Sequence, residues 1–155
     1  MTLQIVPTNW YDWKFRVTDG SQSVANLTVS GWCEQGALNI GASAYRINRE
    51  SWMSGAFILE REDTVLARAE KPSFFRREFV IYHRDREYLL RPESLFRRAF
   101  VLLDSSQHVV GSITPKTAFT RTAAADLPDV LPLPVRMFIV WLTMLSWRRQ
   151  QNSSC

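Results

Sequence analysis

Short stretches of alternating hydrophobic and polar residues fill most of the chain. Residues 13–17 alternate between hydrophobic and polar, and residues 24–29 are rich in β-forming residue types. Between these two stretches, the pair Asp19 and Gly20 is typical of a tight turn. This pattern predicts a β-hairpin. Similar stretches flank short polar segments elsewhere, and they predict strands at residues 3–6, 56–60, 65–69, 79–82, 88–90, 100–103, 109–113 and 119–122.

Two segments, residues 45–57 and 88–100, share a sequence pattern. Tyrosine, Glu-Ser and Ala-Phe occupy the same places in both segments. Phe79 lies midway between Phe57 and Phe100, so the repeating unit is about half of that spacing. A unit of this length accommodates two strands of about 5–6 residues and two short turns. Each unit is therefore predicted to be a hairpin.

The number of predicted strands decides the architecture. A meander of about a dozen strands would expose two long edges, and closure of the sheet removes both. A propeller needs four strands per blade and about 40–45 residues, so this chain is too short for one. We therefore expect an all-β protein with one helix, in which a barrel of about twelve antiparallel strands is built from hairpin repeats.

The C-terminal part of the chain predicts that helix. Three prolines within residues 127–134 preclude a strand, and residues 135–147 are almost wholly apolar on every side. Such a helix must be surrounded by protein or lipid, and its length of about 20 Å is less than the hydrocarbon thickness of about 30 Å. We expect a helix over about residues 135–149 that threads the barrel, with Arg148 and Arg149 in solvent. A helix packed on one face of a β-sandwich is the alternative.

The composition indicates one soluble domain. The chain has 155 residues, of which 46% are hydrophobic and 22% charged, as is typical of a globular protein. Cys33 and Cys155 cannot form a disulfide framework, and the N-terminal residues lack a leader pattern, which favours a cytoplasmic location. We expect a domain over residues 1–150 and a disordered tail over residues 151–155.

Several features together resemble a known family. The hairpins that end at residues 110–113, the segment 126–128 and the apolar helix that finishes at residues 147–149 are similar to the Tubby C-terminal-like superfamily. This superfamily includes phospholipid scramblase and LURP-one-related proteins, and the chain resembles its small bacterial members of unassigned function. The resemblance covers about residues 1–150 and implies a twelve-stranded barrel threaded by a C-terminal helix. Tubby domains bind phosphoinositides and scramblases act on lipids, but the calcium segment and cysteine cluster of scramblases are missing here.

Side chains suited to catalysis are sparse. His83 and His108 lie in predicted polar turns, where a histidine is usually solvated, and Cys33 fits a small buried hydrophobe. Glu50 and Glu93, each followed by a serine, occupy the same place in the repeat, which favours turn capping. The sequence contains no glycine-rich phosphate loop, Cys-x-x-Cys pair or His-x-x-x-His pair. We expect no enzymatic activity, no metal site and no cofactor.

Basic residues give the clearest indication of a partner. Sixteen arginines and three lysines outweigh 15 acidic residues, for a net charge of +4. Guanidinium groups favour phosphate, carboxylate and aromatic partners. Phe-Arg-Arg occurs at residues 75–77 and 96–98, at the start of alternate strands, which places both doublets at one barrel end about 10 Å apart. The candidate anion-binding or lipid-binding residues are Arg76, Arg77, Arg97, Arg98, Lys116 and Arg121.

Two functions fit this pattern. The first is a non-enzymatic binding module whose arginine-rich rim binds anionic phospholipid headgroups or another phosphorylated ligand. Such a protein would lie peripherally at the membrane. The second is a protein-interaction or structural module that contacts an acidic partner. A solvated rim, with local partners such as Glu78, is the purely structural interpretation, because charges beside strand ends also discourage edge pairing. Nucleic acid is not expected, since no helix-turn-helix or RNP pattern is present.

Overall fold

The computed structural model describes residues 2–30, 34–51, 55–72, 76–94, 97–117 and 120–151. Within these residues, twelve strands are followed by one helix. The strands are β1 (Thr2–Pro7), β2 (Lys14–Asp19), β3 (Gln22–Ser30), β4 (Gln35–Ile40), β5 (Ser43–Arg49), β6 (Phe57–Arg61), β7 (Thr64–Glu70), β8 (Phe79–His83), β9 (Arg86–Pro92), β10 (Phe100–Leu103), β11 (Val109–Pro115) and β12 (Ala123–Asp126). The helix is α1 (Leu133–Gln151).

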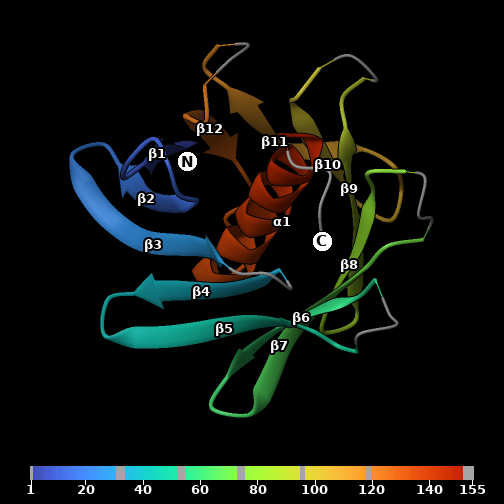
Figure 1. Ribbon diagram of the computed structural model, residues 1–155. Helices are drawn as coiled ribbons and strands as arrows, with labels where there is room; N and C mark the ends of the chain where they lie inside the picture. The colour runs from blue at the N-terminus through green and yellow to red at the C-terminus, as the bar shows by residue number, and fades with distance from the viewer. Residues whose placement is uncertain are drawn as a thin grey trace.

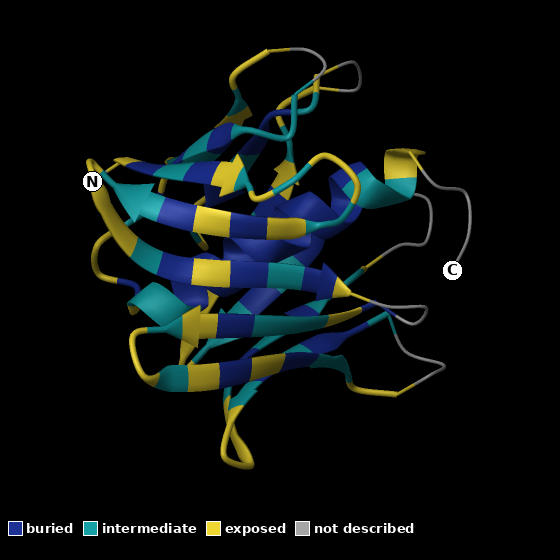
Figure 2. Cartoon of the chain, turned by 60° about the vertical axis from the view of Figure 1, so that its left-hand side comes forward, coloured by how far each residue is buried: buried dark blue, intermediate teal, exposed yellow. Residues whose placement is uncertain are grey.

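The strands form a closed antiparallel barrel around α1, which confirms the predicted fold class (Figure 1). Each strand pairs with its neighbours in sequence, and β1 also pairs with β12, so that Thr2 lies opposite Asp126 and Ile5 opposite Ala123. Closure pairs the backbone N–H and C=O groups of the two strands that would otherwise be edges, as expected for a sheet of this size. Along most strands, buried and more exposed residues alternate (Figure 2), and the buried hydrophobic ones belong to the same core cluster as those of the helix.

The last strand differs from the prediction. A strand was expected at residues 119–122, but Thr120, Arg121 and Thr122 end the connection that precedes β12, and Phe119 lies outside the described residues. The strand itself begins at Ala123. Its inward-facing alanines, Ala123 and Ala125, are fully buried, which leaves room for the helix. Alanine is a weak strand former, so the residue pattern gave little sign of this strand.

The two ends of the barrel differ in the length of their connections. Short turns join β2 to β3, β4 to β5, β6 to β7 and β8 to β9, at the end that we call the narrow rim. Positive φ angles occur in these turns, for example at Gly20 (62°) and Gly41 (59°), where glycine is favoured. The longer connections from β1 to β2, β5 to β6, β7 to β8, β9 to β10 and β11 to β12 lie at the opposite end, the wide rim.

Four of these longer connections are closed in the same way, and this explains the sequence repeat. In each, a backbone amide donates to the carbonyl six residues later: Thr8 to Lys14 (2.9 Å), Glu50 to Ala56 (2.9 Å), Glu93 to Ala99 (2.8 Å) and Lys116 to Thr122 (2.9 Å). Glu50 and Glu93 thus occupy equivalent closing positions. The repeated sequence records a repeated backbone conformation at the wide rim.

The helix runs inside the barrel, and its last turn reaches the wide rim (Figures 1 and 2). Every residue from Val135 to Trp147 is buried. The interior is not wholly apolar, because Arg136, Thr143 and Ser146 are also enclosed. Their polar groups bond to backbone carbonyls: Arg136 Nε donates to Leu131 (2.9 Å), and the hydroxyls of Thr143 and Ser146 donate to the carbonyls four residues earlier (3.1 and 3.0 Å).

The helix extends two residues beyond each predicted end. Gln151, expected in the tail, belongs to α1, and residues 152–155 lie outside the described part of the chain. Among the described residues, no helix has the length and apolarity needed to cross a membrane.

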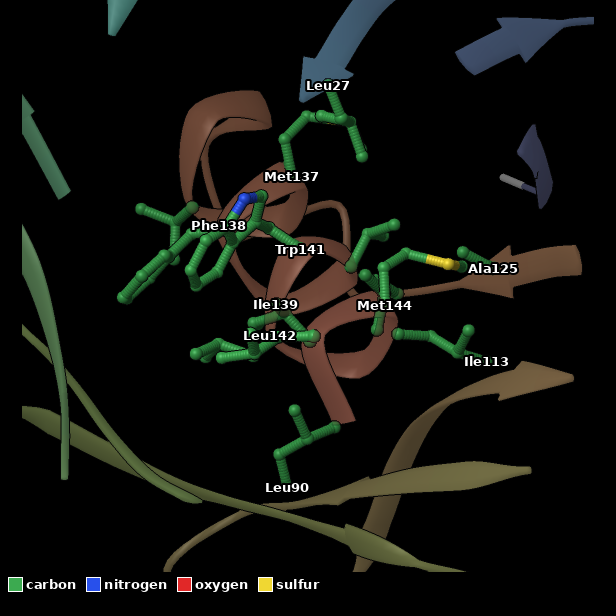
Figure 3. Packing of buried hydrophobic residues seen from close by; sticks show 14 of the residues in the cluster. Leu27, Leu90, Ile113, Ala125, Met137, Phe138, Ile139, Trp141, Leu142 and Met144 are labelled. Atoms are coloured by element: carbon green, nitrogen blue, oxygen red, sulfur yellow. The ribbon is translucent and has the colours of Figure 1, made fainter. Parts of the chain in front are cut away.

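Close packing fixes the helix in register with the strands (Figure 3). Trp141 is fully buried, and its Nε1 donates a hydrogen bond to the carbonyl of Thr28 in β3 (3.0 Å). Its ring lies edge-on to Phe57, with ring centroids 5.3 Å apart. Gly36 in β4 makes room for the indole, because a Cβ there would lie 2.5 Å from Cε2 of Trp141.

Candidate anion-binding site at the wide rim

The structure places all six candidate residues at the wide rim. Arg76 and Arg77 lie between β7 and β8, and Arg97 and Arg98 between β9 and β10. The β11 to β12 connection carries the other two, Lys116 and Arg121. Phe75 and Phe96, which begin the two Phe-Arg-Arg motifs, lie outside the described residues.

Three of the candidates share one hollow. A groove of about 370 Å³ lies between the β9 to β10 connection and the end of β11. Arg97, Arg98 and Lys116 supply three cations to its lining, and Thr114 and Thr117 supply hydroxyl groups. One carboxylate, Glu93, also lines it. We call this hollow the basic groove.

The helix positions Arg98 within the basic groove. The Arg98 guanidinium lies 4.3 Å from the centroid of the Trp147 ring, and Trp147 Nε1 donates to the backbone carbonyl of Arg98 (2.7 Å). The last turns of α1 therefore hold both the side chain and the backbone of this arginine. Burial lowers the pKa of Arg98, but an arginine stays charged at neutral pH. Its charge lies in a less polar setting than those of exposed Arg97 and Lys116.

Arg77 lines a separate, smaller hollow of about 160 Å³ beside the end of the helix. Lys71 and Arg149 are its other cations, and Ser146 also lines it. Burial lowers the pKa of Arg77, and burial followed by the charge of Arg149 lowers the pKa of Lys71 against the opposing effect of Glu34. The structure therefore places Arg77 in a different hollow from Arg97 and Arg98, while Arg76 is exposed and lines neither.

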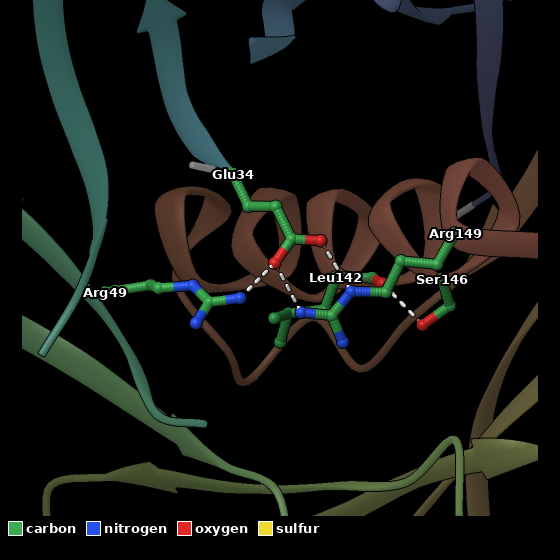
Figure 4. Close-up of polar contacts among 5 residues, drawn as sticks. All are labelled: Glu34, Arg49, Leu142, Ser146 and Arg149. Atoms are coloured by element: carbon green, nitrogen blue, oxygen red, sulfur yellow. Dashed lines mark hydrogen bonds and ion pairs between the residues drawn. The ribbon is translucent and has the colours of Figure 1, made fainter. Parts of the chain in front are cut away.

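A buried carboxylate that the sequence analysis missed anchors this region. Glu34 accepts hydrogen bonds from Nε and Nη2 of Arg149 (both 2.6 Å) and from Nη2 of Arg49 (2.5 Å) (Figure 4). Burial alone would raise the pKa of Glu34, but the hydrogen bonds from Arg149 and Arg49 outweigh it and hold the pKa below its usual value. Arg148 and Arg149 were expected in solvent, but both are only partly exposed, and Arg149 is held by this buried carboxylate. No local pattern could reveal this pair, because its members are 115 residues apart.

Arg121 differs from the other candidates in its contacts. Its guanidinium donates to the backbone carbonyls of Asn9 and Asp12, across the junction between β12 and β1. It also lies 5.2 Å from the centroid of the Trp13 ring and 5.9 Å from that of Phe15. The structure does not bring Arg121 into the basic groove; instead, this side chain braces the β1 to β2 connection.

The described residues that were considered for catalysis belong to different strands and connections of the barrel. His83 lies near the narrow rim, with Nδ1 3.0 Å from the carbonyl of Leu66, and His108 is exposed beside Asp104. The Glu50 carboxylate pairs with Arg68 at 2.5 Å. Cys33 and Cys155 lie outside the described residues. In the described part of the chain, no cluster of three or more histidine, cysteine or acidic residues could hold a metal ion.

Comparison with known proteins identifies the fold. No known protein-family profile matches the chain, and no curated protein sequence matches it. A solved X-ray structure of a protein from Arabidopsis thaliana is similar, with a TM-score of 0.61 and 13% sequence identity. The likeness covers 96% of this chain and 91% of that chain. At this identity, the comparison shows that the chain shares the overall fold of the Arabidopsis protein.

Proposed function

We propose that this protein is a non-enzymatic module that binds anionic phospholipid headgroups in the basic groove. One observation carries the proposal: Arg97, Arg98 and Lys116 converge on a single hollow whose described lining contains one carboxylate, Glu93. Three cations against one anion leave the groove positively charged. An anionic ligand would offset that charge.

The chemistry of the lining fits a phosphate group. A guanidinium donates two parallel hydrogen bonds to phosphate oxygens, and an ammonium adds a compact charge. The hydroxyl groups of Thr114 and Thr117 supply further donors. A volume of about 370 Å³ lies within the range of small-molecule sites, about 300–1,000 Å³. The groove is therefore large enough for one headgroup.

Beyond the basic groove, the other basic residues of the wide rim add a non-selective attraction to an anionic surface. Each basic residue near an acidic leaflet contributes about 1 kcal/mol, so the four arginines of the two doublets would contribute about 4 kcal/mol, near millimolar affinity. The proposal includes a peripheral position at the cytoplasmic face of a membrane. It also includes membership of the Tubby C-terminal-like superfamily, and the closed barrel around a C-terminal helix supports that assignment.

Co-sedimentation with vesicles tests the proposal. Wild-type protein is mixed with phosphatidylcholine vesicles, with or without an acidic lipid, over a series of salt concentrations. The test variant is R97Q/K116Q, and the matched control is R84Q/R86Q at the narrow rim; all four side chains are exposed. Exposed charges contribute little to stability, so both variants should melt close to the wild-type temperature.

We expect the wild type and the control to bind acidic vesicles at low salt, and R97Q/K116Q to lose most of this binding. Binding should weaken steeply as salt shortens the Debye length from about 10 Å at 0.1 M to about 3 Å at 1 M. Binding of free inorganic phosphate in the absence of vesicles, measured by calorimetry, would indicate a soluble phosphorylated ligand. If wild type ignores acidic vesicles at low salt, the proposal fails, and an acidic protein partner becomes the better interpretation.

A further inference from the structure

Two large aromatic side chains at the wide rim are exposed. Trp10 and Tyr11, in the connection between β1 and β2, have exposed fractions of 86% and 71%. Their rings contact each other edge-on, with centroids 5.7 Å apart at an interplanar angle of 85°. Exposed apolar surface of this kind often marks a binding surface.

The connection that carries this pair is well braced. The Asn9 side-chain oxygen accepts hydrogen bonds from the backbone amides of Tyr11 (3.3 Å) and Asp12 (2.9 Å), which forms a turn at the tip. The amide of Thr8 closes the base of the connection on the carbonyl of Lys14 (2.9 Å). Arg121 binds the carbonyls of Asn9 and Asp12 from the neighbouring connection. The backbone is thus fixed on both sides of the aromatic pair.

The aromatic pair lies on the same end of the barrel as the basic groove. Because β1 pairs with β12, with Ile5 opposite Ala123, the β1 to β2 connection adjoins the β11 to β12 connection. That connection begins with Lys116, which lines the groove together with Arg97 and Arg98. Aromatic and basic residues therefore follow one another around a single rim.

We infer that Trp10 and Tyr11 form an anchor that enters the interfacial layer of an anionic bilayer while the basic groove holds a headgroup. This inference rests on the proposed function. Tryptophan and tyrosine concentrate at membrane–water interfaces, because their rings are apolar and their N–H and O–H groups remain hydrated. The adjoining cations match an anionic bilayer surface, so a bilayer suits this combination better than an uncharged apolar protein groove.

The test separates the anchor from electrostatic attraction. The variant W10S/Y11S is compared with V65S/V109S, which changes two exposed apolar residues near the narrow rim (exposed fractions 54% and 61%). Vesicles of phosphatidylcholine with phosphatidylserine are used from low to high salt. We expect W10S/Y11S to bind at low salt but to bind about tenfold more weakly than wild type at high salt, where apolar burial dominates. The valine control should bind like wild type throughout.

A second measurement reports on depth. Lipids brominated near the headgroup end of their chains should quench part of the wild-type tryptophan fluorescence, and W10F should lose most of that quenching. If W10S/Y11S binds vesicles as tightly as wild type at high salt, or if W10F retains the quenching, the proposed anchor is wrong while the proposed headgroup site stands. If wild type fails to bind acidic vesicles at low salt, both proposals are overturned.

Discussion

The carboxylate of Glu34 accepts two hydrogen bonds from the guanidinium of Arg149, each 2.6 Å long. Glu34 directly precedes β4, and Arg149 lies in the last turn of α1. The pair therefore ties the C-terminal end of the helix to the barrel wall at the wide rim. A cation there also complements the partial negative charge at the end of a helix.

Replacing Glu34 with glutamine should lower the free energy of unfolding by about 1–3 kcal/mol, because the carboxylate is only 4% exposed and its loss leaves two guanidinium groups unneutralised. Urea unfolding at neutral pH measures the change. Glu62→Gln, at an exposed narrow-rim turn, is the control and should have little effect. Equal stability of E34Q and wild type would show that Arg49 and Arg149 do not need this partner.

The same pair predicts a pH dependence. Because the pKa of Glu34 is lowered in the folded protein from its ordinary value of 4.5, the unfolded state binds the proton more readily. The stability that Glu34 contributes is fully present above pH 4.5 and is lost as the pH falls through the folded pKa. The difference in urea midpoint between wild type and E34Q should therefore shrink between pH 5 and the acid limit. A difference that grows on acidification would contradict the assigned sign.

A small residue is required where β4 passes Trp141. The substitution Gly36→Ala would place a methyl group against the indole and should lower stability by about 1–3 kcal/mol. Gly55→Ala is the control, because among the described residues its Cβ would meet only Lys71 Cβ, at 3.4 Å, the near limit of ordinary contact. Thermal or urea unfolding measures both variants.

A second substitution tests the cause of this effect. Replacing Trp141 with phenylalanine shortens the ring and removes the Nε1 donor, so W141F should itself be destabilising. If the clash is real, G36A should cost less in the W141F background than in wild type. Strictly additive effects would place the cause elsewhere.

The barrel and its helix could be predicted because their signals are local. Strand alternation, turn residues such as Gly20, and the uninterrupted apolar segment of α1 each act within a few residues. The strands β4 and β5 were not located individually, since β4 contains Gly36, Ala37 and Asn39, which form strands poorly. Their places follow from closure of the barrel around the helix.

The candidate site was predictable only in part. The arginine doublets and Lys116 could be assigned to one rim, because consecutive strands reverse direction at each turn. The division of that rim into two hollows depends on the last turn of α1, and Glu34 meets Arg149 only through the tertiary fold. The exposure of Trp10 was equally hidden, because aromatic residues usually belong to the core.

Arg121 differs from the residues proposed to bind a headgroup, because its guanidinium contacts the backbone of a neighbouring connection. The substitution Arg121→Lys keeps the charge but removes the planar fork that reaches the carbonyls of Asn9 and Asp12. We expect the free energy of unfolding of R121K to be about 1–2 kcal/mol lower than that of wild type. The amide protons of Tyr11 and Asp12 should also exchange with solvent faster than in wild type. Low-salt binding to acidic vesicles should be unchanged, because the rim keeps its charge.

The substitution Arg121→Gln removes both the fork and the charge, so it separates the two roles. If Arg121 only braces the β1 to β2 connection, R121Q should lose stability at least as strongly as R121K while most of its low-salt vesicle binding remains, since Arg97, Arg98 and Lys116 still line the groove. If Arg121 contacts a headgroup directly, R121Q should instead lose binding as strongly as R97Q/K116Q. Full stability of R121K would show that the two carbonyls do not need this guanidinium.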